Sequence, residues 1–348
     1  MRGSRARHAP HVVCSVACSG IPQVEQPVSP RNSTSFQQSV QKLWTSATMM
    51  PQPAQRGGSA KSSAQRTALP KDATTIAVLS LMAAQRTSAS VPELFDMKLR
   101  ALRRDRAQRS GAELFLHERA FADCIDRLNS LRHAFDRALL IGCPDPRWPS
   151  RLRDVAPAVD VLDPGQAFAK AAGGQAVVED AWEPPHAAYD LVLAIGSLDT
   201  VNDLPLALRI LRHAMRPQAL LIGALSGGDT VPMLRRAMLA ADVLTGAAAP
   251  HVHPRIEPAA LAPLLTSAGF VDAVVDVDRV QASYSTLDRL VADLRAMAAT
   301  NILIGRPRFL DRRAYAAAAK TFAGMGDGER TVETFEILHF AAWTPENL

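Results

Sequence analysis

The chain has 348 residues, of which 47% are hydrophobic and 21% charged, an ordinary composition for a globular protein. Its net charge of +5 is unevenly distributed: residues 1–92 hold ten Lys and Arg against two Asp and Glu, and the remainder holds 29 against 32. The body is therefore slightly acidic, which argues against a nucleic-acid partner. Four cysteines do not make a disulfide framework at this length, and no apolar run approaches the roughly 20 residues that span a bilayer.

Residues 1–90 are rich in Ser, Gln, Arg, Pro and Thr and lack a sustained apolar period, which predicts a disordered basic tail. Two interpretations compete. The tail resembles a mitochondrial transit peptide, which would place the protein in the mitochondrial matrix. Alternatively it is an upstream extension from a misplaced start codon in a GC-rich bacterial genome, with Met82 as the true start. The Ala- and Arg-rich body favours the second interpretation and a bacterial cytoplasmic protein.

Apolar residues at helical spacing predict one or two amphipathic helices within residues 91–135. Residues 136–250 then alternate strands with helices, which predicts an α/β fold with a doubly wound parallel sheet. The strands are expected at 138–141, 158–162, 176–180, 189–195 and 219–225, with a helix at 204–215 that Asn202 or Asp203 caps and Pro217 follows.

The remaining segment, residues 251–345, is predicted to belong to the same domain as a helix-rich extension with antiparallel closing strands. Helices are expected near 233–244, 258–268, 286–299 and 312–323, and strands at 273–277 and 335–342.

Candidate site residues follow from where ligands bind in such sheets, outside the carboxyl ends of the strands at the point where strand order reverses. Asp160 is predicted to end the second strand, where a carboxylate can accept both ribose hydroxyls of a nucleoside, and Asp163 is its neighbouring alternative. Asp180 is predicted to end the third strand, where a carboxylate can hold an adenine amino group. A solvated strand-end carboxylate or a helix cap is the alternative for each.

Further candidates lie on the substrate side of the site. The sequence predicts no metal site and identifies no catalytic residue. Asp203 is predicted to cap a helix rather than to act in catalysis. The glycines of the turn at 227–230 suit any sharp turn, and the two histidines at 251 and 253 have no third ligand nearby. These substrate-side candidates are Asp203, Gly227, Gly228, Asp229, Thr230, His251 and His253.

Several blocks together carry a family resemblance that covers roughly residues 93–343. They include Tyr189-Asp-Leu-Val192, Val201-Asn-Asp-Leu-Pro205, Ile222-Gly-Ala-Leu-Ser-Gly-Gly-Asp-Thr230, Pro250-His-Val-His-Pro254 and Ala268-Gly-Phe270. Their order resembles the class I S-adenosylmethionine-dependent methyltransferases. More narrowly, it resembles the methyltransferase-like assembly factor of respiratory complex I and its bacterial relatives.

The resemblance implies a seven-stranded Rossmann-like methyltransferase sheet and S-adenosylmethionine as cofactor. It implies a protein substrate, with a complex I subunit as the candidate and peripheral membrane association only through that partner. The mitochondrial family member is credited with arginine hydroxylation rather than methyl transfer, and the malonyl-carrier-protein methyltransferase of biotin synthesis is a close cousin. The cofactor-binding positions that it implies are Gly142, Cys143, Asp160, Asp180, Ala181 and Ile195.

Two departures from the family pattern concern the cofactor. The glycine-rich loop after the first strand is replaced by Gly142-Cys-Pro-Asp-Pro-Arg-Trp148, whose Cβ atoms and proline rings should crowd the methionine part of the cofactor. The family's His-Trp pair is replaced by Asp199-Thr200, which removes an aromatic wall. Asp160 and Asp180 match the ribose and adenine positions, so the nucleoside half of the site is predicted to be retained and the methionine half altered. The sequence therefore predicts an S-adenosylmethionine-dependent methyltransferase-like protein that acts on a protein substrate in complex I assembly. Two alternatives stay open: a degenerate, non-catalytic fold that acts as a binding and assembly module, and a malonyl-carrier-protein O-methyltransferase-like enzyme.

Overall fold

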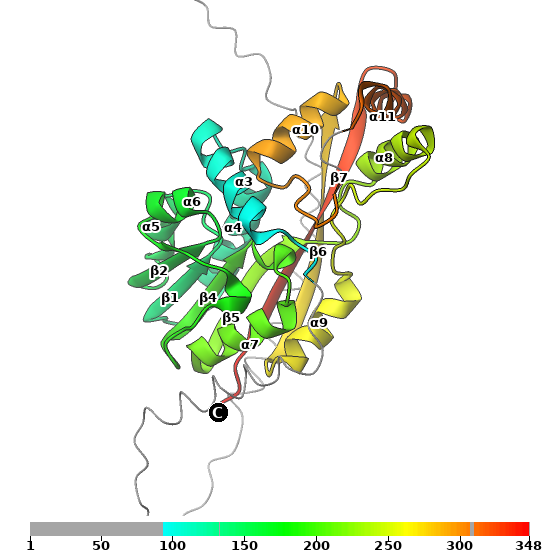
Figure 1. The fold of residues 1–348 in the computed structure, drawn as a ribbon. Helices are drawn as coiled ribbons and strands as arrows, with labels where there is room; N and C mark the ends of the chain where they lie inside the picture. Colours follow the sequence, from blue (N-terminus) through cyan, green and yellow to red (C-terminus); the bar gives the residue numbers. More distant parts are fainter. Residues whose placement is uncertain (1–92, 132, 307–309, 348) are drawn as a thin grey trace, which may run out of the picture.

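The computed structural model describes residues 93–131, 133–306 and 310–347, and their helices and strands are arranged around one central sheet (Figure 1). The predicted basic tail at 1–90, with its candidate start at Met82, lies outside the described residues. Among the residues described, no helix is long and apolar enough to cross a membrane.

The described residues form a seven-stranded sheet of order β3-β2-β1-β4-β5-β7-β6, in which β7 runs antiparallel to β5 and β6. The first five strands are parallel to one another. This order, with its antiparallel seventh strand, is that of the class I methyltransferase fold, so the predicted fold class is confirmed. The strands are β1 (Arg137–Ile141), β2 (Ala158–Asp163), β3 (Gln175–Ala176), β4 (Tyr189–Ile195), β5 (Met215–Ser226), β6 (Val271–Tyr284) and β7 (Thr331–Trp343).

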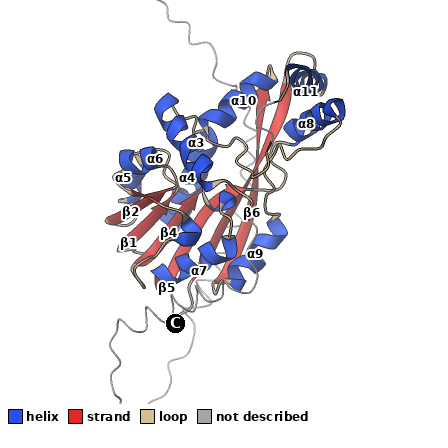
Figure 2. Ribbon diagram, viewed as in Figure 1, coloured by secondary structure: helices blue, strands red, loops and turns tan. Residues whose placement is uncertain are grey.

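Helices cover both faces of this sheet, as Figure 2 shows. Side chains of α4 (Phe115–Ser130), α5 (Trp148–Leu152), α8 (Pro232–Thr245), α10 (Leu287–Ala296) and α11 (Arg312–Gly324) contribute to one hydrophobic cluster; side chains of α7 (Leu204–Ala214) and α9 (Pro258–Ser267) contribute to the other. The remaining α-helices of the described residues are α3 (Met97–Ser110) and α6 (Gln166–Ala171).

β1 and β4 are apolar at almost every position because helices cover both faces of the sheet. Leu140 and Leu193 belong to one cluster, whereas Leu139 and Val192 belong to the other. Successive side chains of a strand point to opposite faces, so a strand that is covered on both faces must be apolar at every position.

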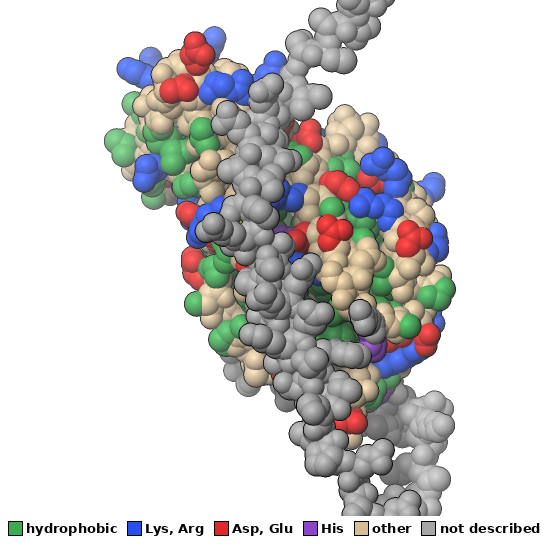
Figure 3. All heavy atoms as spheres, turned by 180° about the vertical axis from the view of Figure 1, so that it is seen from behind, with side chains coloured by type: hydrophobic (Ala, Val, Ile, Leu, Met, Phe, Trp, Pro, Cys, Tyr) green, Lys and Arg blue, Asp and Glu red, His purple; other side chains and the backbone are tan. Residues whose placement is uncertain are grey.

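The long strands β6 and β7 extend beyond the parallel part of the sheet, and α8 and α11 lie at their far end (Figure 1). Both strands are longer than the predicted 273–277 and 335–342, because their outer halves pair with each other. In these halves β6 exposes Arg279 and Gln281, whereas β7 exposes Val332 and buries Glu333. Seen from behind, the lobe that carries these two helices shows apolar side chains on its surface (Figure 3).

The boundaries of the third and fifth strands also differ from the prediction. The third strand does not run from 176 to 180: it ends at Ala176, and the chain then turns through the short 3-10 segment η2 (Glu179–Ala181), which directs Glu179 into the interior. The fifth strand begins at Met215, so Pro217 lies inside it. The pairing with β4 shifts register there, and a proline without an N–H is tolerated where the ladder is interrupted.

Gly223 in the middle of β5 offers a test of the packing between β4, β5 and β7. A Cβ atom at this position would overlap the carbonyl oxygen of Ala194 and lie 2.8 Å from Cζ of Phe340. We expect Gly223→Val to lower the free energy of unfolding by about 1–3 kcal/mol, because neither the sheet backbone nor the buried ring can move away. Urea unfolding would measure this. Gly324→Ala is the matched control, since nothing lies within 4 Å of the added atom, and an equal loss there would contradict the steric explanation.

Candidate functional site

The ligand edge of this sheet lies where β1 is flanked by β2 on one side and β4 on the other, at the carboxyl ends of these strands. Gly142 ends β1 with φ of 77°, a left-handed conformation that glycine adopts without strain. A Cβ atom here would overlap the carbonyl oxygen of Ile195 at the end of β4. Gly142 is therefore explained by the close approach of two chain segments, whether or not a cofactor binds beside it.

The loop that follows Gly142 is packed into the protein. Cys143 is fully buried, and burial raises the pKa of its thiol, which keeps it protonated. Trp148 is also fully buried, and its ring stacks on Phe121 of α4 with centroids 4.3 Å apart. Its indole nitrogen donates to Glu118 at 2.8 Å. The residues that replace the glycine-rich loop thus anchor it to α4.

Asp160 does not end β2, contrary to the prediction. It is the third of six residues in the strand, and its carboxylate, which is 43% exposed, pairs with Arg137 at 2.7 Å and accepts from the hydroxyl of Tyr189 at 3.0 Å. Tyr189 begins β4, so this cluster lies toward the amino ends of the parallel strands. The expected strand 158–162 is one residue short, and Asp160 lies three residues before the end of β2, so the ribose position passes to the alternative, Asp163.

Asp163 is the last residue of β2 and is fully buried, and both of its oxygens are occupied. Oδ1 accepts from Nε of Arg104 at 2.8 Å and from the backbone N–H of Gly165 at 2.7 Å. Oδ2 accepts from Nη2 of Arg104 at 2.5 Å and from the backbone N–H of Cys143 at 2.8 Å. A carboxylate has about four lone-pair sites, and here all four accept hydrogen bonds from the protein.

A second arginine of α3 makes an equivalent pair one turn earlier. Arg100 donates from Nη1 and Nη2 to the two oxygens of Glu179, at 2.6 and 2.8 Å, and from Nη2 to the carbonyl oxygen of Ser197 at 2.6 Å. Arg100 and Arg104 are four residues apart, so they project from the same face of the helix. All four charged side chains are nearly or completely buried.

In each of these two pairs the arginine and the carboxylate neutralise each other's charge. Burial by itself would lower the pKa of Arg104, but the charge and hydrogen bonds of Asp163 outweigh burial and raise it. Bidentate contacts between arginine and carboxylate are among the strongest hydrogen-bonded pairs in proteins. The structure therefore closes the ends of β2 and β3 with positive charges that the chain itself supplies.

Sequence patterns missed Arg100, Arg104 and Glu179 as site residues. The available signal was two arginines spaced by four on a predicted helix, which usually indicates a solvated face. Nothing in the local sequence shows that this face meets the sheet edge, because the contacts join positions 59 and 79 residues apart.

Asp180 and Ala181 lie in η2, next to Glu179. One oxygen of Asp180 accepts from the backbone N–H of Asp203 at 2.9 Å, and Asp203 in turn caps α7 by accepting from the N–H of Leu206 at 2.8 Å. The predicted capping role of Asp203 is confirmed. The adenine-binding role of Asp180 stays a prediction.

The turn at 227–230 packs against β7. Thr230 is buried, and its hydroxyl donates to the carbonyl oxygen of Glu336 at 3.1 Å. A Cβ atom on Gly227 would overlap the carboxylate of Glu336, and one on Gly228 would overlap that of Glu257. Asp229, more exposed, reaches Glu336 through its backbone N–H at 3.3 Å. These contacts explain residues 227–230 as a turn that packs against β7.

The two histidines at 251 and 253 have different hydrogen-bond partners. His251 contacts Asp242 at 2.7 Å through Nε2. His253 accepts from the backbone N–H of Ile302 at 2.9 Å, and burial followed by the charge of Arg255 lowers its pKa to about 3. His253 is therefore neutral at ordinary pH. Among the described side chains, no group of three or more His, Cys, Asp or Glu could hold a metal ion.

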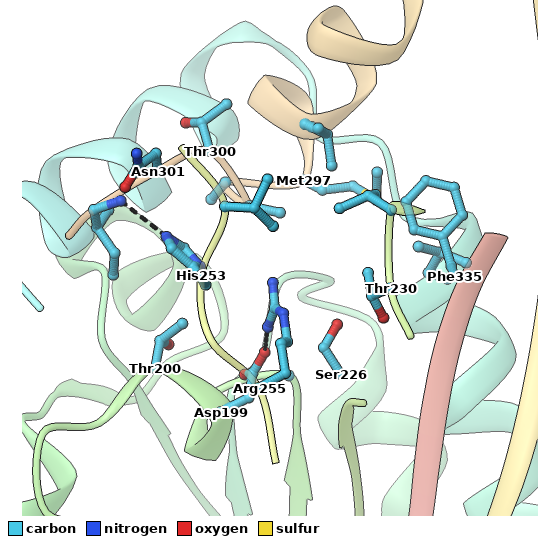
Figure 4. A pocket seen from close by; sticks show the side chains of 18 of the residues that line it. Asp199, Thr200, Ser226, Thr230, His253, Arg255, Met297, Thr300, Asn301 and Phe335 are labelled. Carbon is cyan, nitrogen blue, oxygen red and sulfur yellow. Dashed lines mark hydrogen bonds and ion pairs between the residues drawn. The ribbon is translucent and has the colours of Figure 1, made fainter. Parts of the chain in front are cut away.

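A cavity of about 620 Å³ lies beside α3, over the carboxyl ends of β4 and β5. Figure 4 shows the ion pair of Asp199 and Arg255 on one wall, with Ser226 and Thr230 on another. Arg100 and Arg104 line this cavity, but Gly142, Asp163 and Asp180 do not. Of the predicted residues, it brings together Ile195, Thr230, His251 and His253. Arg100 and Arg104 of α3 therefore lie between the cavity and Asp163, the predicted ribose position.

Sequence comparison finds related proteins but no matching family model. The mitochondrial arginine-hydroxylase NDUFAF5 of Danio rerio is 36% identical over 162 residues, 46% of this chain and 50% of that protein. The malonyl-[acyl-carrier protein] O-methyltransferase of Xylella fastidiosa is 32% identical over 161 residues, 46% of this chain and 53% of that protein. The chain thus spans about half the length of the curated relatives it matches.

A solved structure, the N-methyltransferase NodS of Bradyrhizobium japonicum in complex with S-adenosyl-L-homocysteine, matches 71% of this chain and 99% of its own with a TM-score of 0.40 and 14% identity. The sequence relation and the strand order of the sheet are independent observations. The protein has the class I methyltransferase fold and is related in sequence to the arginine hydroxylases and malonyl-carrier-protein O-methyltransferases.

Proposed function

We propose that this protein is a non-catalytic methyltransferase-fold module that binds and assembles a protein partner without S-adenosylmethionine. The observation that carries this proposal is the carboxylate of Asp163, whose acceptor sites are filled by Arg104 and two backbone N–H groups. The resemblance of the sequence motifs to the complex I assembly factor makes a complex I subunit the proposed partner. The proposed place of action is the bacterial cytoplasm at the inner membrane, with the mitochondrial matrix as the alternative.

The energetic argument rests on what a bound nucleoside would have to displace. Ribose hydroxyls are donors, and they would need the acceptor sites on Asp163 that Arg104 occupies. Breaking one buried ion pair costs about 3–5 kcal/mol, and Arg100 with Glu179 forms a second such pair on the same helix. Micromolar binding supplies only about −8 kcal/mol in total. Displacement of the Arg104–Asp163 pair alone would consume about half of that free energy.

The loop after β1 adds a second obstacle. Glycine-rich loops hold a cofactor with backbone N–H groups that approach it closely. Here the N–H of Cys143 donates to Asp163, and Pro144 and Pro146 have no N–H to offer. The loop therefore offers few donors to the methionine half of a cofactor.

A protein partner is supported by apolar residues on the outer surface of α8. Leu239, Val243 and Leu244 are 61%, 84% and 56% exposed. Leu239 and Val243 are four residues apart and share a helix face. Figure 3 shows apolar side chains on the lobe that α8 forms with α11. Grouped exposed apolar side chains are typical of protein interaction surfaces.

The second candidate is an S-adenosylmethionine-dependent enzyme that methylates a protein or hydroxylates its arginine. The sequence relation to NDUFAF5 favours it, as does the cavity next to the cofactor edge. It requires α3 to move and release Asp163. A malonyl-carrier-protein methyltransferase is a third candidate function, supported by the sequence relation to the Xylella enzyme.

Calorimetric titration of the full chain with S-adenosylmethionine separates these functions. We expect no saturable heat, with a Kd weaker than about 1 mM, because the ribose acceptors are occupied. Circular dichroism would confirm that the sample is folded, and an active methyltransferase titrated in the same buffer is the positive control. A micromolar Kd would contradict the proposal and support the enzyme.

Arg104→Leu tests the pairing on which the closed edge depends. We expect the free energy of unfolding to fall by about 3–5 kcal/mol, because the variant leaves Asp163 buried without its counter-charge. Urea unfolding measures the change. The matched control is Arg109→Leu in the same helix, where the side chain is exposed and the change should stay within about 0.5 kcal/mol. Equal effects of the two substitutions would show that Arg104 is not a buried partner of Asp163.

Complementation tests the assembly role itself. Deletion of the gene should lower the amount of assembled complex I, measured on native gels, and the parent should restore it. Asp180→Asn should restore it equally, because the amide oxygen can still accept from Asp203 and no cofactor is needed. An unchanged amount of assembled complex I in the deletion strain would contradict the assembly role. If the Asp180→Asn protein is stably produced but does not restore complex I, the result would favour the enzyme.

A further inference from the structure

Three arginines that face the cavity lack ionic partners among the residues that the structure describes. Arg103 and Arg106 come from α3, and Arg295 comes from α10. Nη1 of Arg103 is buried and has no hydrogen-bond partner. Burial, followed by the like charges of Arg306, Arg106 and Arg295, lowers the pKa of Arg103 to about 10. The nearby charge of Asp96 raises the pKa and so offsets part of this repulsion, but positive charge is concentrated at this part of the cavity.

The acids that line the cavity do not neutralise these arginines. Asp199 pairs with Arg255, and Glu336 pairs with Arg279 at 2.8 Å. Arg100 and Arg104, which also line the cavity, are matched by Glu179 and Asp163. The cavity therefore has a net positive wall formed by Arg103, Arg106 and Arg295.

Another wall of the cavity is apolar. Its side chains come from α4, α8, α10, the residue that follows α10, and β7, and Figure 4 shows Met297 and Phe335 among them. The principal members are Leu116, Met238, Leu294, Met297 and Phe335. These residues offer a lining for a hydrocarbon body, whereas the arginines offer a site for its charged end.

A neutral polar group also lines the cavity. Nδ1 of His117 is buried without a hydrogen-bond partner. Burial, followed by the charge of Arg104, lowers the pKa of His117 to about 4, so the ring is uncharged at neutral pH. An unpaired buried nitrogen costs free energy, and a bound polar group would recover it.

We propose that this cavity binds an amphipathic carboxylate, a small molecule with an apolar body and one anionic end. The carboxylate contacts Arg103 and Arg295, and the body lies along Met238, Met297 and Phe335. The volume of about 620 Å³ is within the usual range for small-ligand pockets. This site lies on the other side of Arg100 and Arg104 from Asp163, although its lining includes Ile195, one of the predicted cofactor positions.

Titration of the full chain with decanoate tests the proposal. We expect saturable binding with a micromolar Kd. The double variant Arg103→Gln with Arg295→Gln should raise the Kd for decanoate at least tenfold, because it removes both charges. The control is Arg109→Gln with Arg289→Gln, on the same two helices but outside the cavity lining, which should leave the Kd unchanged. Circular dichroism would confirm that both double variants fold.

Two further probes separate the charged end from the apolar body. 1-Decanol, which has the same chain without the charge, should bind at least tenfold more weakly than decanoate. Inorganic phosphate should not displace decanoate at comparable concentration. The proposal is overturned if decanoate does not saturate, if both double variants bind it like the parent, if decanol binds equally well, or if phosphate competes equally. None of these outcomes bears on S-adenosylmethionine, which the calorimetric titration tests separately.

Discussion

The bidentate pair of Arg104 and Asp163 is the interaction on which the rest of the site depends. It joins α3, which precedes the sheet, to the end of β2, and the same carboxylate accepts from the backbone of the loop after β1. One side chain therefore holds together a helix, a strand end and the loop at the ligand edge. Arg100 repeats the arrangement with Glu179 one turn away. In a related fold that binds a nucleoside, this edge would have to present free acceptors; here the chain satisfies them itself.

This closure divides the carboxyl edge of the sheet into two regions of different character. Over β2 and β3, charges are matched and buried, so a ligand would have to break strong pairs to enter. Over β4 and β5, a cavity remains, with unmatched arginines on one wall and apolar side chains on another. The free-energy cost of entry is high in the first region and low in the second. The difference favours a protein that binds partners without the cofactor, and a separate ligand in the cavity over β4 and β5.

Much of the secondary structure could be predicted from local pattern. The apolar runs of β1 and β4 and the amphipathic helices α7 to α11 lie where the sequence places them, within a few residues. Errors arose where tertiary contacts override local pattern. Asp160 does not end β2, because pairing with β1 continues as far as Leu162. Glu179 falls within the predicted strand 176–180, but in the structure its side chain turns inward to meet Arg100.

The sequence by itself determined the class of fold, the capping role of Asp203 and the loss of glycine from the loop after β1, because periodicity, caps and residue identity are local properties. It also carried the resemblance to the complex I assembly factor, which depends on residue order alone. Only the tertiary structure decided that Asp163 rather than Asp160 ends β2, that Arg100 and Arg104 occupy the carboxylates at this edge, and that Arg103 and Arg295 meet at one cavity. These pairings join segments far apart in the chain, and the burial that makes them strong arises only when α3 packs against the sheet.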